Sequence, residues 1–112
     1  MRIFSSMHSN PSLDLRPDHL TLILDILRKH VPDREVRAFG SRVQGSAKTH
    51  SDLDIVLMGT EPMELLDMAK LQDAFSESAL PMKIDVLDWQ TISPEFRKLI
   101  EKKYVVLKAA LR

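Results

Sequence analysis

A short glycine turn followed by two aspartates at strand spacing constrains this chain more than any other feature. Gly40 and Ser41 are followed by ten residues and then by Asp52-x-Asp54. If residues 52–58 form a strand, both carboxylates lie on one face of it, because side chains alternate along an extended chain. Two like charges this close raise each other's pKa unless a cation lies between them. The pattern therefore predicts a sheet that carries a pair of carboxylates beside a tight turn.

The residue types at these positions suit a metal ion and a nucleotide. Mg²⁺ prefers oxygen ligands, takes one or two carboxylates from a protein and completes its shell with water and phosphate oxygens. Glycine at position 40 lets the backbone approach a ligand, and Ser41 can offer its hydroxyl and N–H to a phosphate oxygen. Arg42 either contacts a triphosphate or is a solvated residue of the first helical turn. We expect Gly40, Ser41 and Arg42 to bind nucleotide and Asp52 and Asp54 to bind metal.

A third carboxylate lies in the apolar segment 83–87. If this segment is a strand, Asp85 shares a face with Leu87, whereas Asp88 falls on the opposite face. A carboxylate in an apolar strand usually has a partner, because an unpaired buried charge costs several kcal/mol. Asp85 is therefore either a third residue of the site or one half of an ion pair with a lysine or arginine.

Alternating helical and extended patterns predict the fold class. Apolar residues at helical spacing predict helices over residues 17–30 and 62–79, and Ser93-Pro94 predicts a further helix to about residue 103. Strands are expected over residues 35–39, 52–58 and 83–87, with another extended stretch at 104–107. A short helix should follow the glycine turn. This order favours an α/β (α+β) domain, a small mixed β-sheet flanked by helices.

Length and composition limit the possible partners. A chain of 112 residues with 44% apolar content suits one domain, and we expect residues 1–15 to be a flexible N-terminal leader and residues 16–112 to fold. The 16 basic residues balance the 16 acidic ones, which argues against binding to duplex DNA. There is no cysteine for a disulfide or a thiolate metal site. No apolar run reaches the roughly 20 residues that span a bilayer, so we expect a cytoplasmic protein that binds no membrane.

The complete motif is more specific than its parts. The string FGSRVQG at residues 39–45 with SDLD at residues 51–54 resembles the polymerase-beta-like nucleotidyltransferases, and most closely their short members, the minimal nucleotidyltransferases. The resemblance extends from the helix near residue 17 to the segment 93–97. It implies the polymerase-beta-like fold, with Asp52, Asp54 and Asp85 as catalytic residues that bind two Mg²⁺ ions. It also implies ATP or another nucleoside triphosphate as substrate, and Asp85 as general base for the acceptor hydroxyl.

The same resemblance implies a protein partner. Many minimal nucleotidyltransferases are antitoxins paired with a helical HEPN toxin, and larger relatives bind the acceptor with a second domain. A chain of this size leaves acceptor binding to another subunit. The resemblance therefore implies transfer of a nucleotide, AMP first, to a toxin hydroxyl such as that of tyrosine, within a hetero-oligomer. Two alternatives stay open: transfer to a small molecule bound by a separate subunit, and neutralisation of the partner by binding without catalysis.

Overall fold

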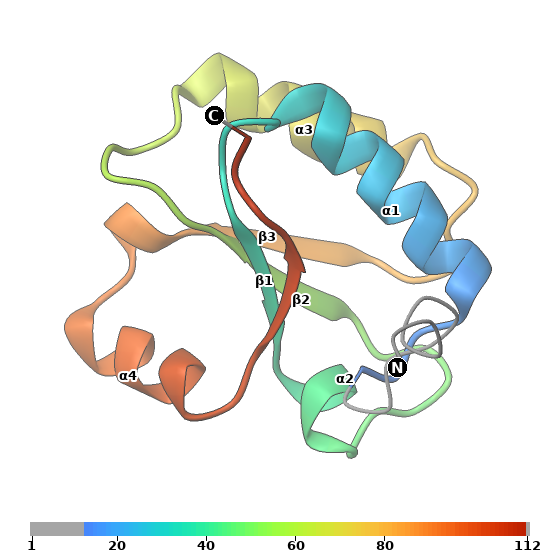
Figure 1. Ribbon diagram of the computed structural model, residues 1–112. Coiled ribbons are helices and arrows are strands. Elements are labelled where there is room, and N and C mark those ends of the chain that lie inside the picture. Colours follow the sequence, from blue (N-terminus) through green and yellow to red (C-terminus); the bar gives the residue numbers. More distant parts are fainter. Residues whose placement is uncertain (1–12, 112) are drawn as a thin grey trace, which may run out of the picture.

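Helices and strands alternate along residues 13–111, the part of the chain that the structure, a computed structural model, describes (Figure 1). The elements follow in the order α1 (Pro17–His30), β1 (Val36–Phe39), α2 (Ser41–Gln44), β2 (Leu53–Leu57), α3 (Leu65–Ser76), β3 (Ile84–Asp88), the 3-10 turn η2 (Trp89–Thr91), α4 (Pro94–Lys102) and β4 (Val105–Lys108). Every predicted helix and strand is present, so the α+β prediction is confirmed.

The four strands form one mixed sheet in the order β3-β2-β1-β4. Strand β1 is antiparallel to both β2 and β4, whereas β2 and β3 are parallel. Parallel neighbours need a long crossover connection, and α3 provides it. The register pairs Asp54 of β2 with Phe39 of β1 on one side and with Asp85 of β3 on the other. The topology thus brings the glycine turn and the two strand carboxylates together.

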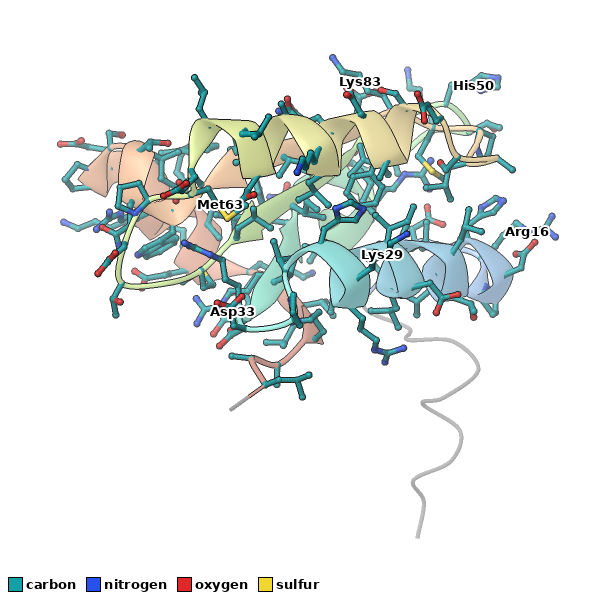
Figure 2. All side chains as sticks on the ribbon, turned by 90° about the horizontal axis from the view of Figure 1, so that it is seen from above. Arg16, Lys29, Asp33, His50, Met63 and Lys83 are labelled. Carbon is teal, nitrogen blue, oxygen red and sulfur yellow. The ribbon has the colours of Figure 1, made fainter. Side chains whose placement is uncertain are left out.

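The two faces of the sheet are covered differently. Helices α1 and α3 run side by side over one face, as Figures 1 and 2 both show, and bury Ile23, Leu27, Leu71 and Phe75 in the larger core. Full burial of one such side chain stabilises the fold by about 1.5–3 kcal/mol. Helix α4 packs on the opposite face, where a smaller cluster of buried residues consists of Phe39, Val56 and Ile100. Because α4 alone of the described helices packs on this second face, part of the sheet there is left uncovered and can carry a functional site.

The ends of the helices follow local hydrogen bonds. The Ser93 hydroxyl accepts a hydrogen bond from the Phe96 N–H at 3.1 Å, so the predicted N-cap of α4 is confirmed. Helix α3 is shorter than the expected 62–79. Its start is delayed because the Met63 N–H donates to the Asp88 carboxylate at 2.7 Å, and at its end the Ser78 hydroxyl donates to the Phe75 carbonyl at 2.6 Å.

The expected boundary of the N-terminal leader is wrong for residues 13–15. Leu13 and Leu15 are only 6% and 8% exposed and belong to the larger core, and the Asp14 N–H donates to the Arg42 carbonyl at 2.6 Å. The rest of the expected leader, residues 1–12, lies outside the described part. None of the helices described here is long and apolar enough to cross a membrane.

Candidate active site

Asp54 and Asp85 are direct neighbours on parallel strands. Their backbones pair in the sheet, where adjacent strands lie about 4.8 Å apart. Side-chain alternation puts both carboxylates on the face that α4 covers in part, because Leu53, Ile55 and Val86 point into the core on the other face. Asp88 is buried on that opposite side of β3, as expected, and accepts hydrogen bonds from the N–H groups of Met63 and Gln90. It holds the loops around the strand.

Gly40 lies directly against Asp54. Its φ of 84° and ψ of −155° fall in a region that is almost restricted to glycine. A Cβ atom at this position would overlap Oδ2 of Asp54 and lie 3.2 Å from its Cγ. Glycine is therefore required at position 40 by the approach of the carboxylate as well as by backbone conformation.

The electrostatics of the site centre on Asp54. Burial raises the pKa of Asp54, and the negative charges of Asp85 and Asp52 raise it further. Within residues 13–111 neither Asp54 nor Asp85 has an ion-pair partner, so the alternative that Asp85 forms an ion pair is wrong. A carboxylate that is disfavoured by burial and by like charge suits a divalent cation nearby.

The three carboxylates are not gathered around one point. Among the described residues, no group of three histidine, cysteine, aspartate or glutamate side chains lies close enough together to hold a metal ion. Asp52 precedes β2 and is exposed, whereas Asp54 and Asp85 sit within the sheet. The set of three as metal ligands stays a prediction.

A cleft of about 400 Å³ opens over Gly40, Asp54 and Asp85. Its remaining walls come from β1, α2, β3 and α4: Phe39, Gln44, Leu87, Phe96, Leu99, Ile100, Lys102 and Lys103. The cleft therefore joins two carboxylates, an apolar wall and two ammonium groups. Sequence reasoning missed Lys102 and Lys103. A lysine pair at the end of an amphipathic helix was the available signal, but the same pattern is common on solvated surfaces.

Aromatic contacts hold α4 over the sheet. The rings of Phe39 and Phe96 meet edge to face, with centroids 5.8 Å apart. The Arg97 guanidinium lies 5.0 Å from the Trp89 ring centroid and donates to the Trp89 carbonyl at 2.9 Å. Contacts of this kind are worth about 0.5–1.5 kcal/mol each. They fix the first turn of α4 on the sheet, and the buried Ile100 packs the helix close to Lys102 and Lys103.

Arg42 holds the loop between α2 and β2. Its guanidinium donates to the carbonyls of Ser51 at 3.0 Å, Asp14 at 2.9 Å and Thr49 at 3.3 Å. The side chain is 7% exposed, so the alternative of a solvated residue is wrong. Arg42 does not line the cleft, and its contact with a nucleotide stays a prediction. In the structure Arg42 is a buried residue whose hydrogen bonds hold the loop that leads into Asp52 against residue 14.

The remaining predicted site residue lies at the rim. Ser41 is the first residue of α2, is half-buried, and is not among the residues that line the cleft. The first N–H groups of a helix have no partner inside the helix, so the N–H of Ser41, at the start of α2, is not bonded within that helix. The structure thus brings Gly40, Asp54 and Asp85 into one cleft and leaves Ser41 and Asp52 beside it.

Comparisons with known sequences agree with this geometry. Residues 22–110 match the family model described as "Polymerase beta, Nucleotidyltransferase". A protein of Haemophilus influenzae named "Probable protein adenylyltransferase MntA" is 48% identical over 101 residues, which are 90% of this chain and 89% of that protein. A "Protein adenylyltransferase MntA" of Thermococcus cleftensis is 30% identical over 79 residues, 70% of this chain and 79% of that protein.

Solved structures share the fold at lower identity. A structure described as a toxin-antitoxin with AMP-PNP superposes with a TM-score of 0.69 at 23% identity, over 81% of this chain and 73% of that one. A complex of a tri-AMPylated Shewanella oneidensis HEPN toxin with an MNT antitoxin gives a TM-score of 0.60 at 20% identity, over 81% and 70% of the two chains. With the carboxylate pair beside the glycine turn and a family match that spans most of its length, this chain belongs to the polymerase beta nucleotidyltransferase family.

Proposed function

We propose that this protein is a protein adenylyltransferase, which transfers AMP from ATP to a hydroxyl group of a partner protein, and that the partner is a HEPN toxin for which it serves as antitoxin. The observation that carries the proposal is the cleft in which Gly40, Asp54 and Asp85 meet. The name of the Haemophilus relative supports the reaction, and the AMP-PNP complex of a structural relative supports a nucleoside triphosphate as substrate.

The reaction is a displacement at the α-phosphorus of ATP. The acceptor oxygen forms a bond to that phosphorus, the bond to the β-phosphate oxygen breaks, and pyrophosphate leaves. The acceptor proton passes to a base, and we assign this role to Asp85; its position in the wall of the cleft, paired with Asp54 in the sheet, supports the assignment. General-base help of this kind contributes about 10²- to 10⁴-fold in rate.

The carboxylate oxygens of Asp54 and Asp85, on adjacent strands, are the kind of ligand that Mg²⁺ takes one or two of, with water and phosphate oxygens completing its shell. Burial and the neighbouring carboxylates raise the pKa of Asp54, and a bound cation would relieve that cost. Bound there, Mg²⁺ would neutralise charge on the attacking and leaving oxygens. The ammonium groups of Lys102 and Lys103 on the facing wall attract phosphate oxygens. The apolar wall between them suits the face of a nucleobase.

Transfer of AMP would inhibit the activity of a ribonuclease partner through electrostatic repulsion and steric hindrance. An AMP group adds a negative phosphate and a bulky nucleoside, and a site that binds RNA must attract phosphates of the same sign. The structural relatives described as toxin–antitoxin complexes support a partner of this kind. A cytoplasmic location is part of the same proposal.

The test is incubation of the purified chain with the protein encoded beside its gene, Mg²⁺ and each nucleoside triphosphate in turn, followed by intact mass measurement of both proteins. We expect the partner to gain one or more AMP groups with ATP. Transfer should fall by at least about a thousandfold with Asp54→Asn, which removes several kcal/mol of transition-state stabilisation. An unmodified partner that the chain still inhibits would instead indicate neutralisation by binding. Modification of a small molecule alone would place the chain among small-molecule nucleotidyltransferases.

A further inference from the structure

Arg37 of β1 carries a charge that the proposed chemistry does not use. Its neighbours Val36 and Ala38 belong to the larger core, so the Arg37 side chain lies on the opposite face of the sheet, on which α4 packs. The side chain is only 18% exposed, and Arg37 is not among the residues that line the cleft. A cation that is largely removed from water needs partners to compensate for its lost hydration. The contacts of Arg37 therefore indicate its role.

The partners of Arg37 come from three separate places in the chain. Its Nε donates to the Glu35 carboxylate at 2.6 Å. Its guanidinium carbon lies 4.3 Å from the centroid of the Tyr104 ring and 5.9 Å from that of the Trp89 ring. Both distances are within the roughly 6 Å at which a cation is attracted to the face of a ring. These contacts, named here the Arg37 stack, connect β1 to the segment that joins α4 to β4.

Tyr104 directly follows Lys103, one of the two lysines that line the cleft. Helix α4 ends at Lys102, and the backbone of Lys103 is extended, with a φ of −159° and a ψ of 116°. Along an extended backbone, the side chains of neighbouring residues point to opposite sides. While the Tyr104 ring rests on Arg37, the side chain of Lys103 is therefore directed away from that ring and lines the cleft.

We propose that Arg37 is a positioning residue for nucleotide binding: through the Tyr104 ring it holds the backbone at residues 103 and 104 so that the Lys103 ammonium group faces the cleft. This role rests on the proposed function, in which that ammonium group attracts phosphate oxygens. A free lysine side chain samples many rotamers, so a fixed backbone direction reduces the conformational entropy that is lost when the ammonium group binds phosphate. Arg37 lies outside the cleft and acts only through Tyr104.

Nucleotide affinity tests this role without any acceptor. The Kd of a fluorescent ATP analogue is measured with Mg²⁺ for the parent and the variants, at a temperature where circular dichroism shows all of them folded. Tyr104→Ser removes the ring, and Arg37→Lys keeps the charge but loses the planar group that stacks on it. We expect each change to raise the Kd about three- to tenfold, as the loss of partly buried cation–π contacts allows. Tyr104→Phe, which keeps the face of a ring, should restore the parent Kd.

Val106→Ser is the matched control. Val106 lies on β4 two residues beyond Tyr104, is 48% exposed, and belongs neither to the Arg37 stack nor to the lining of the cleft. This variant shortens a half-exposed side chain next to the stack, and its Kd should equal that of the parent. An equal rise of the Kd in Val106→Ser and Tyr104→Ser would overturn the role of the stack.

The same changes in a Lys103→Ser background separate positioning from a general effect on the fold. If Arg37 acts through Lys103, then Tyr104→Ser and Arg37→Lys should raise the Kd of Lys103→Ser by less than about twofold, because changes within one coupled unit are not additive. The same rise in both backgrounds would overturn the proposal, as would parent-like affinity of both Tyr104→Ser and Arg37→Lys. A parent that shows the expected differences in Kd but transfers no AMP would support the role of Arg37 and contradict the proposed function. A parent that binds no nucleotide would overturn both.

Discussion

Replacing either of two glycines separates the structural need for glycine from the catalytic one. Gly40→Ala places a methyl group in a backbone region that is nearly exclusive to glycine, at a cost of about 1–3 kcal/mol of folding free energy. That methyl group also overlaps Oδ2 of Asp54, so the carboxylate must move. Gly45 has a φ of 80° and a ψ of 14°, and a Cβ there would meet nothing within 4 Å. Gly45→Ala should cost about 1–2 kcal/mol for the left-handed conformation alone.

The two variants should therefore resemble each other in stability and differ in activity. Urea denaturation should give losses of free energy of unfolding within the ranges above for both. Transfer of AMP from labelled ATP should fall by about a hundredfold or more for Gly40→Ala, since displacement of a catalytic group by about 1 Å costs that much. Gly45→Ala should keep the parent rate at temperatures where it is folded. A Gly40→Ala variant with parental transfer would refute the role of the close contact with Asp54, and so would an equal loss of activity in both.

Three further predictions concern charge. The pKa of Asp54 is raised above its ordinary 3.8, so ionisation of this carboxyl lowers the stability of the fold progressively as the pH rises from about 3.8 to the folded-state pKa, and the full loss is present above that pKa. Asp54→Asn, measured with a chelator present, should therefore be at least as stable as the parent at pH 7, and this advantage should shrink on acidification. A variant that is less stable than the parent at pH 7 would contradict this. Arg42→Lys should lower the free energy of unfolding by about 2–3 kcal/mol, because an ammonium group cannot reach the three carbonyls that the guanidinium bonds. An unchanged free energy of unfolding in chemical denaturation would show that these hydrogen bonds do not stabilise the fold. Replacing both Lys102 and Lys103 by serine should raise the KM for ATP by at least about tenfold through lost contacts to phosphate. The control Lys98→Ser, on the same helix, should leave the KM unchanged. If the double variant and the parent have equal KM values for ATP, Lys102 and Lys103 do not bind the nucleotide.

The sequence predicted the parts of the site that depend on local periodicity. Alternation along a strand is enough to put Asp54 on the open face of the sheet and Asp88 on the other, and both positions are as expected. Helix ends with a local signal, such as Ser93 followed by Pro94, were also predictable. The family motif then identified Asp85 as the third acidic residue, and β3 lies next to β2 as that assignment requires.

Features that depend on tertiary contacts could not be read from local sequence. The three carbonyls that Arg42 holds come from two separate segments, 14 and 49–51, that meet only in the folded chain. Leu13 looked like part of a polar leader because its burial depends on the core formed elsewhere. Lys102 and Lys103 reach the cleft through the tertiary packing of α4 on the sheet, in which Ile100 is buried and Phe96 contacts Phe39.

Coexpression of the chain with the protein encoded beside its gene tests the central claim most directly, with Asp85→Asn as the deciding variant. Intact mass and cell growth are measured together. The account predicts that the parent protects cells and shifts the partner's mass by one or more AMP groups. It predicts that Asp85→Asn still forms the complex but modifies the partner about 10²- to 10⁴-fold more slowly and loses protection. Equal protection by Asp85→Asn, with no mass shift for either form, would contradict the enzymatic account and favour neutralisation by binding.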